Sequence, residues 1–310
     1  MTRAYGRLPH TDDPRDWRAR ATQPYTGEFV DLSPGMPPVW NQGQLGSCVA
    51  FGSAAALCYA RAKAGLEPLD PSQLFTYFAA RARAGYDTNA DTGLEIRDGI
   101  NSLAKDGIPP WDDWPYIVED FAEVPPRKAY QDAASDEATV YGAVPADGVD
   151  AMIASGFPVV IGFDVYSSFE SDLTASTGVM PVPGPREQLL GGHCVVLCST
   201  PRDGAAIPGG KPGVMYRRGR NSWGLGWGDG GYFWYPVPAM VHASDFWQVT
   251  TVSAPGPTPV PPSPPTPTGQ WRVGRHLGRT LYNGDRFEGM LESRALAARV
   301  ADLLNTEGSS

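Results

Sequence analysis

The chain has 310 residues, and its 34 Asp and Glu residues outnumber its 25 Lys and Arg residues, which gives a formal net charge of −9 at pH 7. A hydrophobic share of 42% with 19% charged residues is typical of globular proteins and excludes a disordered or fibrous chain. The acidic balance, without a cluster of Lys and Arg, excludes nucleic acid as a partner, because phosphate binding needs a basic surface.

Residues 1–29 are predicted to form an N-terminal extension without a targeting signal. Five arginines lie between Arg3 and Arg20, but no apolar run follows them, so the sequence does not support Sec export. The longest nearly uncharged apolar run, 48–60, has 13 residues, and a bilayer span needs about 20. We therefore expect no membrane span and a cytoplasmic location by default, with packaging in a virion or release by lysis as the alternatives.

Helices are predicted in the first half of the chain. The Ala-rich run 48–60 is apolar on all sides, which indicates a buried helix. Between Pro71 and Leu103, apolar residues recur at helical spacing on both sides of the polar turn 86–93.

From Gly156 onward the pattern changes to short β-branched and aromatic runs separated by Gly and Pro. These runs, typical of antiparallel strands, are PVVIGFDVY, GHCVVLCS, VMYRRGRNSW and GYFWYP. Helices followed by a sheet predict an α+β domain over residues 30–254, with a helical lobe and a β lobe. A cleft between the two lobes is the expected functional site.

The last part of the chain is predicted to be a separate small module. Eight of the 14 residues in 255–268 are proline, which indicates an extended linker. In the following ββα module, 269–310, Asn283–Gly284 predicts a hairpin turn and Ser293 is placed to cap a helix. Because so few residues bury little surface, we expect this accessory module to dock on the body, on another copy or on a protein partner.

Cys48 follows a turn containing Gly43 and Gly46 and begins the first predicted helix. Unpaired N–H groups and the helix dipole favour a thiolate at such a position, and a nearby imidazolium lowers a cysteine pKa further. A buried structural cysteine is the alternative for an isolated residue. His193 and Asn221 follow in the chain, however, and this order fits a nucleophile, its base and the group that orients the base.

Three motifs carry a resemblance to a known family: QGxxGSCxAF at 42–51, GHCVV at 192–196 and NSWGxGWGxxGYF at 221–233. They resemble the active-site blocks of papain-like cysteine peptidases, and the resemblance covers about residues 30 to 250. The opening GRLPHTDDPRDW also looks like the start of bacterial and phage members. The resemblance implies the papain-like two-lobed fold, with a helical lobe and an antiparallel β-barrel-like lobe.

The resemblance also implies residue roles. Cys48 is the nucleophile, His193 the general base and then acid, and Asn221 the amide that orients the imidazole. Gln42 contributes its amide N–H to an oxyanion hole together with the backbone N–H of Cys48. Trp223 shields the hydrogen bond between Asn221 and His193 from water.

Asp91 and Gly93 are assigned to the wall that binds substrate, with the Gly93 backbone pairing to an extended peptide. No metal and no cofactor are expected, because the sequence has no CxxC pair and Cys194 and Cys198 are interpreted as core thiols on one strand face. Leu45 occupies a position where many secreted relatives have a disulfide-bonded cysteine, so we expect free thiols. The chain has no long helical propeptide, so regulation is expected to come from the short start, a partner or neither.

These observations predict a cysteine-type endopeptidase that hydrolyses peptide bonds in peptide or protein substrates through a thioester acyl-enzyme. An aminopeptidase or a peptidoglycan-stem amidase on the same fold is one alternative. A binding or virion-assembly protein that works through its C-terminal module is another. The presence of all four catalytic candidates argues against a scaffold that has lost its activity.

Overall fold

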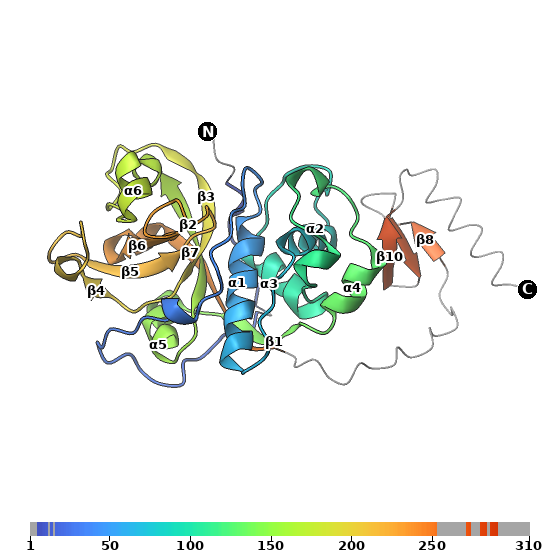
Figure 1. Ribbon diagram of the computed structural model, residues 1–310, viewed down its shortest axis with the longest axis horizontal. Helices are drawn as coiled ribbons and strands as arrows, with labels where there is room; N and C mark the ends of the chain where they lie inside the picture. The colour runs from blue at the N-terminus through green and yellow to red at the C-terminus, as the bar shows by residue number, and fades with distance from the viewer. Residues whose placement is uncertain are drawn as a thin grey trace, which may run out of the picture.

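The computed structural model describes residues 5–252 except 12 and 15, together with 271–273, 280–283 and 286–290 (Figure 1). The helices are α1 (Cys48–Lys63), α2 (Gln73–Ala84), α3 (Ile96–Lys105), α4 (Arg127–Ala133), α5 (Val149–Ala154) and α6 (Asp172–Thr177). The strands of the body are β1 (Ala138–Ala143), β2 (Val159–Tyr166), β3 (Leu189–Leu197), β4 (Arg202–Asp203), β5 (Met215–Arg220), β6 (Tyr232–Pro236) and β7 (Ala243–Val252).

The seven strands of the body form one antiparallel sheet in the order β1-β7-β2-β3-β5-β4, with β6 paired to β5. The four strands predicted after Gly156 are confirmed as β2, β3, β5 and β6. Strands β1 and β7 were not predicted, and they pair with each other across more than one hundred residues of chain. The α+β architecture with a helical lobe and a β lobe is confirmed.

Helix α1 stands between the two lobes, with α2 to α4 on one side and the sheet on the other (Figure 1). It is buried from Cys48 through Leu57, as the uniformly apolar run predicts. Its approach to β3 requires a glycine, because a Cβ on Gly52 would lie 2.9 Å from the Cys194 sulfur. The start of α1 is therefore fixed against the strand that carries His193.

The sheet separates two apolar cores, because successive residues of a strand point to opposite faces. Val160 and Cys194 pack with α1, α2 and α3 in one core. Ile161 and Phe163 pack in the other core, which contains Trp223 and the buried face of α5. Neighbouring residues of β3 thus serve two different environments.

The hairpin predicted at Asn283–Gly284 is confirmed by the pairing of β9 (Thr280–Asn283) with β10 (Arg286–Met290). A third strand that was not predicted, β8 (Trp271–Val273), pairs with β9. The Pro-rich linker and the helix predicted after Ser293 lie outside the described residues. Within the part of the chain that is described, no helix combines the length and the apolar character that crossing a bilayer requires.

Candidate active site

Cys48 is the first residue of α1, as predicted, and its side chain is fully buried. The preceding residue, Ser47, provides no side-chain cap for the helix. Backbone groups of Cys194, Gly6 and Val49 hydrogen-bond the thiol. Two of these groups come from segments far from Cys48 in the chain, so the thiol lies where α1, β3 and the N-terminal extension meet.

The expectation of a stabilised thiolate is not met in this form of the protein. Burial raises the pKa of Cys48 from 9.0 to about 11, although the three backbone hydrogen bonds and the charge of Arg7 act in the opposite direction. The free energy lost when a thiolate is removed from water is larger than the stabilisation that a few backbone N–H dipoles provide. The sulfur is therefore a protonated thiol as long as it remains covered.

His193 lies on β3 and Asn221 directly follows β5. The His193 Nε2 and Asn221 Oδ1 atoms are 2.8 Å apart, and the same oxygen accepts a hydrogen bond from the Ser222 backbone N–H at 2.8 Å. The indole of Trp223 stacks on the imidazole with ring centroids 4.9 Å apart. All of these side chains are buried, so the hydrogen bond lies in a medium of low dielectric.

Further aromatic rings surround the imidazole. Phe163 and Phe169 lie with their centroids 5.9 and 6.4 Å from that of His193. Both rings belong to the apolar core that contains Trp223, so the same core also lines the histidine. Tyr5 adds an edge-on contact at 6.1 Å from the N-terminal extension.

Gln42 is fully buried and held at both ends of its amide. Its Nε2 donates to the Leu45 carbonyl at 2.9 Å, and its Oε1 accepts from the Ser222 hydroxyl at 2.6 Å. The backbone N–H of Gln42 also donates to the Ser222 carbonyl at 2.9 Å. Ser222, which the sequence analysis did not single out, thus connects Gln42 to the residue that contacts His193.

Asp91 lies in the turn behind the thiol. Its carboxylate accepts the Gly46 N–H at 2.9 Å and also the Tyr77 hydroxyl. The Tyr77 oxygen in turn accepts the Gly93 N–H at 3.1 Å. Asp91 therefore fixes the backbone of Gly46 and Gly93, whereas the sequence analysis assigned it to the substrate wall.

Residues 5–8 run across the site in an extended conformation. Gly6 accepts a hydrogen bond from the Leu94 N–H at 2.8 Å, Arg7 donates to the Gly192 carbonyl at 3.0 Å, and Leu8 donates to the Leu94 carbonyl at 2.9 Å. A Cβ on Gly6 would overlap the Gly46 carbonyl oxygen, so only glycine fits beside the thiol. Of the three sources of regulation considered from the sequence, the structure places the short start against Cys48.

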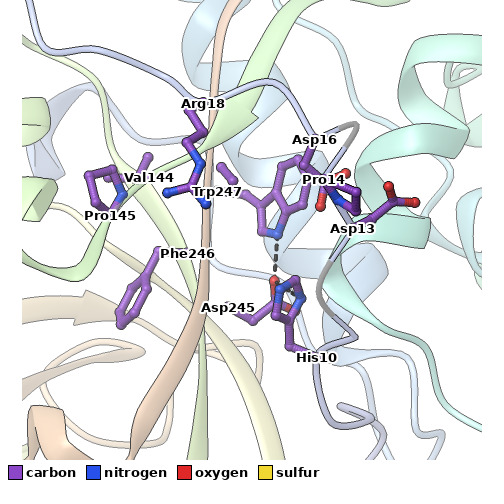
Figure 2. Close-up of a pocket in the computed structure, with 11 residues that line it drawn as sticks. His10, Asp13, Pro14, Asp16, Arg18, Val144, Pro145, Asp245, Phe246 and Trp247 are labelled. Atoms are coloured by element: carbon purple, nitrogen blue, oxygen red, sulfur yellow. Dashed lines mark hydrogen bonds and ion pairs between the residues drawn. The ribbon is translucent and has the colours of Figure 1, made fainter.

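The remainder of the extension is fixed by ionic contacts to α3 and by main-chain pairing. Arg97 binds Asp16 at 2.6 Å and Asp13 at 3.4 Å, and Ala19 donates to the Ala143 carbonyl at 2.8 Å. A pocket of about 450 Å³ lies between the extension and strands β1 and β7. Figure 2 shows His10 and the Trp247 indole meeting at the carboxylate of Asp245. The catalytic candidates do not line this pocket.

The other three cysteines, Cys58, Cys194 and Cys198, are free and buried, and burial raises the pKa of each. Among the described residues no cluster of three His, Cys, Asp or Glu side chains has the arrangement of a metal site.

Comparison with known proteins identifies the family. The papain family of cysteine proteases matches residues 28–239. An uncharacterized peptidase C1-like protein of Acanthamoeba polyphaga mimivirus is 31% identical over 229 residues, which cover 69% of this chain and 70% of that protein. Cathepsin K of Gallus gallus is 31% identical over 205 residues, but these cover only 54% of its length.

Among solved structures, xylellain, a cysteine protease from Xylella fastidiosa, superposes with a TM-score of 0.70. It is 31% identical in sequence, and the match covers 81% of this chain and 97% of that one. The chain belongs to the papain family and is a cysteine peptidase.

Proposed function

We propose that the protein is an endopeptidase that uses Cys48, His193 and Asn221 as a catalytic triad and forms a thioester acyl-enzyme. The observation that carries the proposal is the 2.8 Å contact from His193 Nε2 to Asn221 Oδ1. The residue after His193 is Cys194, whose backbone contacts the Cys48 thiol, so the histidine and the thiol are held close to each other. Because Nε2 is bound to the amide, Nδ1 is the nitrogen that exchanges a proton with the sulfur.

The reaction proceeds in two halves. His193 takes the thiol proton, and the sulfur attacks the peptide carbonyl carbon, forming the C–S bond and a tetrahedral oxyanion. The oxyanion collapses with cleavage of the C–N bond, and the amine leaves with the proton from His193. Water then attacks the thioester, His193 takes a proton from this water, and the carboxylic acid leaves as the sulfur recovers its proton.

The oxyanion is stabilised by the Cys48 N–H and the Gln42 side-chain amide. Gln42 uses one amide proton for the Leu45 carbonyl, and its second proton serves the oxyanion. Its contacts to Ser222 fix the amide before substrate arrives. Such preorganised donors provide the largest single contribution in many acyl-transfer enzymes.

An endopeptidase is favoured because a continuous chain already crosses the thiol. Residue 5 contacts His193 on one side of Gly6, and residues 7 and 8 pair with Gly192 and Leu94 on the other. This segment is not positioned for cleavage. The Gly6 N–H, rather than a carbonyl carbon, faces the sulfur, and the Gly6 carbonyl accepts a hydrogen bond from the Leu94 N–H. The next N–H, that of Arg7, donates to the Gly192 carbonyl. The described form is therefore a latent one, and turnover requires residues 5–8 to leave.

The proposal is tested by mass-spectrometric cleavage profiling of wild type and Cys48→Ala on a mixed proteome digest. We expect new cleavage sites within chains for wild type and none for Cys48→Ala. An epoxysuccinyl inhibitor should add once to wild type, on Cys48. Cleavage or labelling that persists in Cys48→Ala would refute the assignment of the nucleophile, and trimming from chain ends alone would replace the endopeptidase by an exopeptidase.

A further inference from the structure

Two glycines leave a hollow on the face of the sheet that looks toward the N-terminal extension. The register of β2 with β3 pairs Gly162 with Cys194 and Asp164 with Gly192. Directly paired residues of antiparallel strands share a face. Two of these four residues are glycines, so the face presents a bare surface with one carboxylate, that of Asp164, at its border.

The side chain of Arg7 fills this surface. A Cβ on Gly162 would lie 2.9 Å from Arg7 Nε, and a Cβ on Gly192 would lie 3.0 Å from the same atom. The guanidinium reaches Asp164, with Nη2 and Oδ1 3.0 Å apart. The Arg7 side chain is only 5% exposed, whereas that of Asp164 is 44% exposed, so the arginine is inserted and the acid stands at the mouth. We call this site, formed by Gly162, Gly192 and Asp164, the Arg7 pocket.

The main chain around Arg7 makes contacts that any extended peptide offers. The Gly192 carbonyl accepts from residue 7, and Leu94 both donates to residue 6 and accepts from residue 8. These hydrogen bonds hold a backbone in register but do not distinguish one side chain from another. The pocket that holds the side chain of residue 7 must therefore be what distinguishes one substrate side chain from another.

We propose that the Arg7 pocket is a specificity site that selects a lysine or arginine side chain of the substrate once residues 5–8 have left. The inference rests on the endopeptidase function proposed above. Asp164 is the specificity-determining residue, and the two glycines provide the space for a long side chain to reach it.

The charge of the site excludes the competing side chains to different degrees. An acidic side chain would meet Asp164 directly, and the buried carboxylate of Asp245 is also close enough for Arg7 to act on its pKa. An apolar side chain would fit over the glycines, but it would form no ion pair with Asp164, whose carboxylate would then be hydrated only. Hydrogen bonds between charged partners predict a preference for a basic over an apolar side chain of roughly tenfold to a hundredfold, and the exposure of Asp164 places the value near the lower end.

The test uses the full-length protein and a series of peptides that differ at one position, with Arg, Lys, Leu or Glu there, scanned along each side of the scissile bond. At one position kcat/KM for Arg and Lys is expected to exceed that for Leu by about tenfold. Asp164→Asn should reduce this ratio below about threefold at that position alone, and Asp164→Lys should favour Glu over Arg. Asp164 is on the surface side of the pocket, so these variants retain the packed core.

Asp16→Asn is the matched control, because it removes a carboxylate that holds the extension to Arg97 and lies outside the pocket. It should change the rates for all peptides by the same factor and leave their ratios unaltered. The inference is overturned if wild type cleaves these peptides without a basic preference, or if the preference survives Asp164→Asn. A wild type that cleaves no peptide, or cleavage that survives Cys48→Ala, refutes the proposed function itself and the inference with it.

Discussion

Replacing Gly6 by alanine should release the N-terminal extension from the nucleophile. Three main-chain hydrogen bonds hold residues 6–8, which at about 1 kcal/mol each amounts to roughly 3 kcal/mol. A Cβ on Gly6 would overlap the Gly46 carbonyl oxygen, and overpacking costs about 1–3 kcal/mol, with the upper end expected against a fixed backbone atom. The clash therefore offsets most of the energy of these hydrogen bonds, and the side-chain contacts of Arg7 to Asp164 and of Tyr5 to Glu170 remain to hold the segment. The share of undocked molecules should accordingly rise strongly above that of wild type.

Undocking changes the ionisation of Cys48. With a pKa of about 11, only about three thiols in ten thousand are ionised at pH 7.5. A return to the ordinary value of 9.0 raises that share to about 3%, and alkylation, which requires the thiolate, should accelerate by up to about a hundredfold. Pairing with His193 in the open form would increase the rate further.

The assay is the rate of iodoacetamide labelling, followed by peptide mapping at pH 7.5. Gly184→Ala is the matched control, because its added methyl group meets nothing nearer than 3.6 Å. The buried thiols Cys194 and Cys198 serve as internal references. Equal Cys48 rates in Gly6→Ala, Gly184→Ala and wild type would refute the role assigned to residues 5–8, and a parallel rise at the reference thiols would indicate unfolding instead.

Four further outcomes are expected. Asn221→Ala should lower kcat roughly tenfold to a hundredfold with little change in KM, because the imidazole loses the amide that orients it, and it should lower the thermal midpoint by a few degrees, because the buried Ser222 N–H loses its acceptor; an unchanged kcat would remove it from the triad. Gln42→Ala should lower kcat about 10²–10³-fold, measured on the same peptide, as expected for loss of one oxyanion donor. Gly52→Ala should lower the thermal midpoint by several degrees in calorimetry, since its methyl group would meet the Cys194 sulfur at 2.9 Å. Raising the pH from 9 to 11 should favour the open form of wild type, because the covered Cys48 thiol binds its proton more tightly than the exposed one; hydrogen-exchange protection factors of the Arg7 and Leu8 amides that do not fall over this range would contradict it.

The catalytic candidates were predictable because short motifs carry them. Cys48 begins a helix after a glycine turn, and His193 lies within an apolar run predicted as a strand, so local sequence was enough to place both. The strands β1 and β7 were missed because they pair with each other although more than one hundred residues separate them in the chain, so no turn signal between them indicates the pairing. Pairing between distant segments is a property of the assembled core rather than of a local pattern.

The burial of the nucleophile was not predictable from the motifs around it. The dipole argument for Cys48 holds for an open helix end, but residues 5–8, which lie at least forty positions earlier in the chain, close that end. Gly6 gave no turn signal, since it serves close approach to Gly46 rather than a bend. Likewise, Gly162 and Gly192 acquire their meaning only from the β2–β3 register, which places them on the same face.

Arg7 and the substrate side chain compete for the same pocket. The contacts that determine specificity therefore also stabilise the latent form. A substrate that must displace a docked segment binds with its intrinsic affinity multiplied by the fraction of open molecules. A stronger ion pair to Asp164 therefore improves the discrimination for basic side chains and at the same time closes the enzyme more tightly against all substrates. Asp164→Asn should accordingly act in two opposite directions: it should lower the preference for Arg over Leu while increasing the absolute kcat/KM for the Leu peptide. A site that only discriminated among substrates would lose the preference without that gain, and a segment that only blocked the thiol would give the gain without losing the preference.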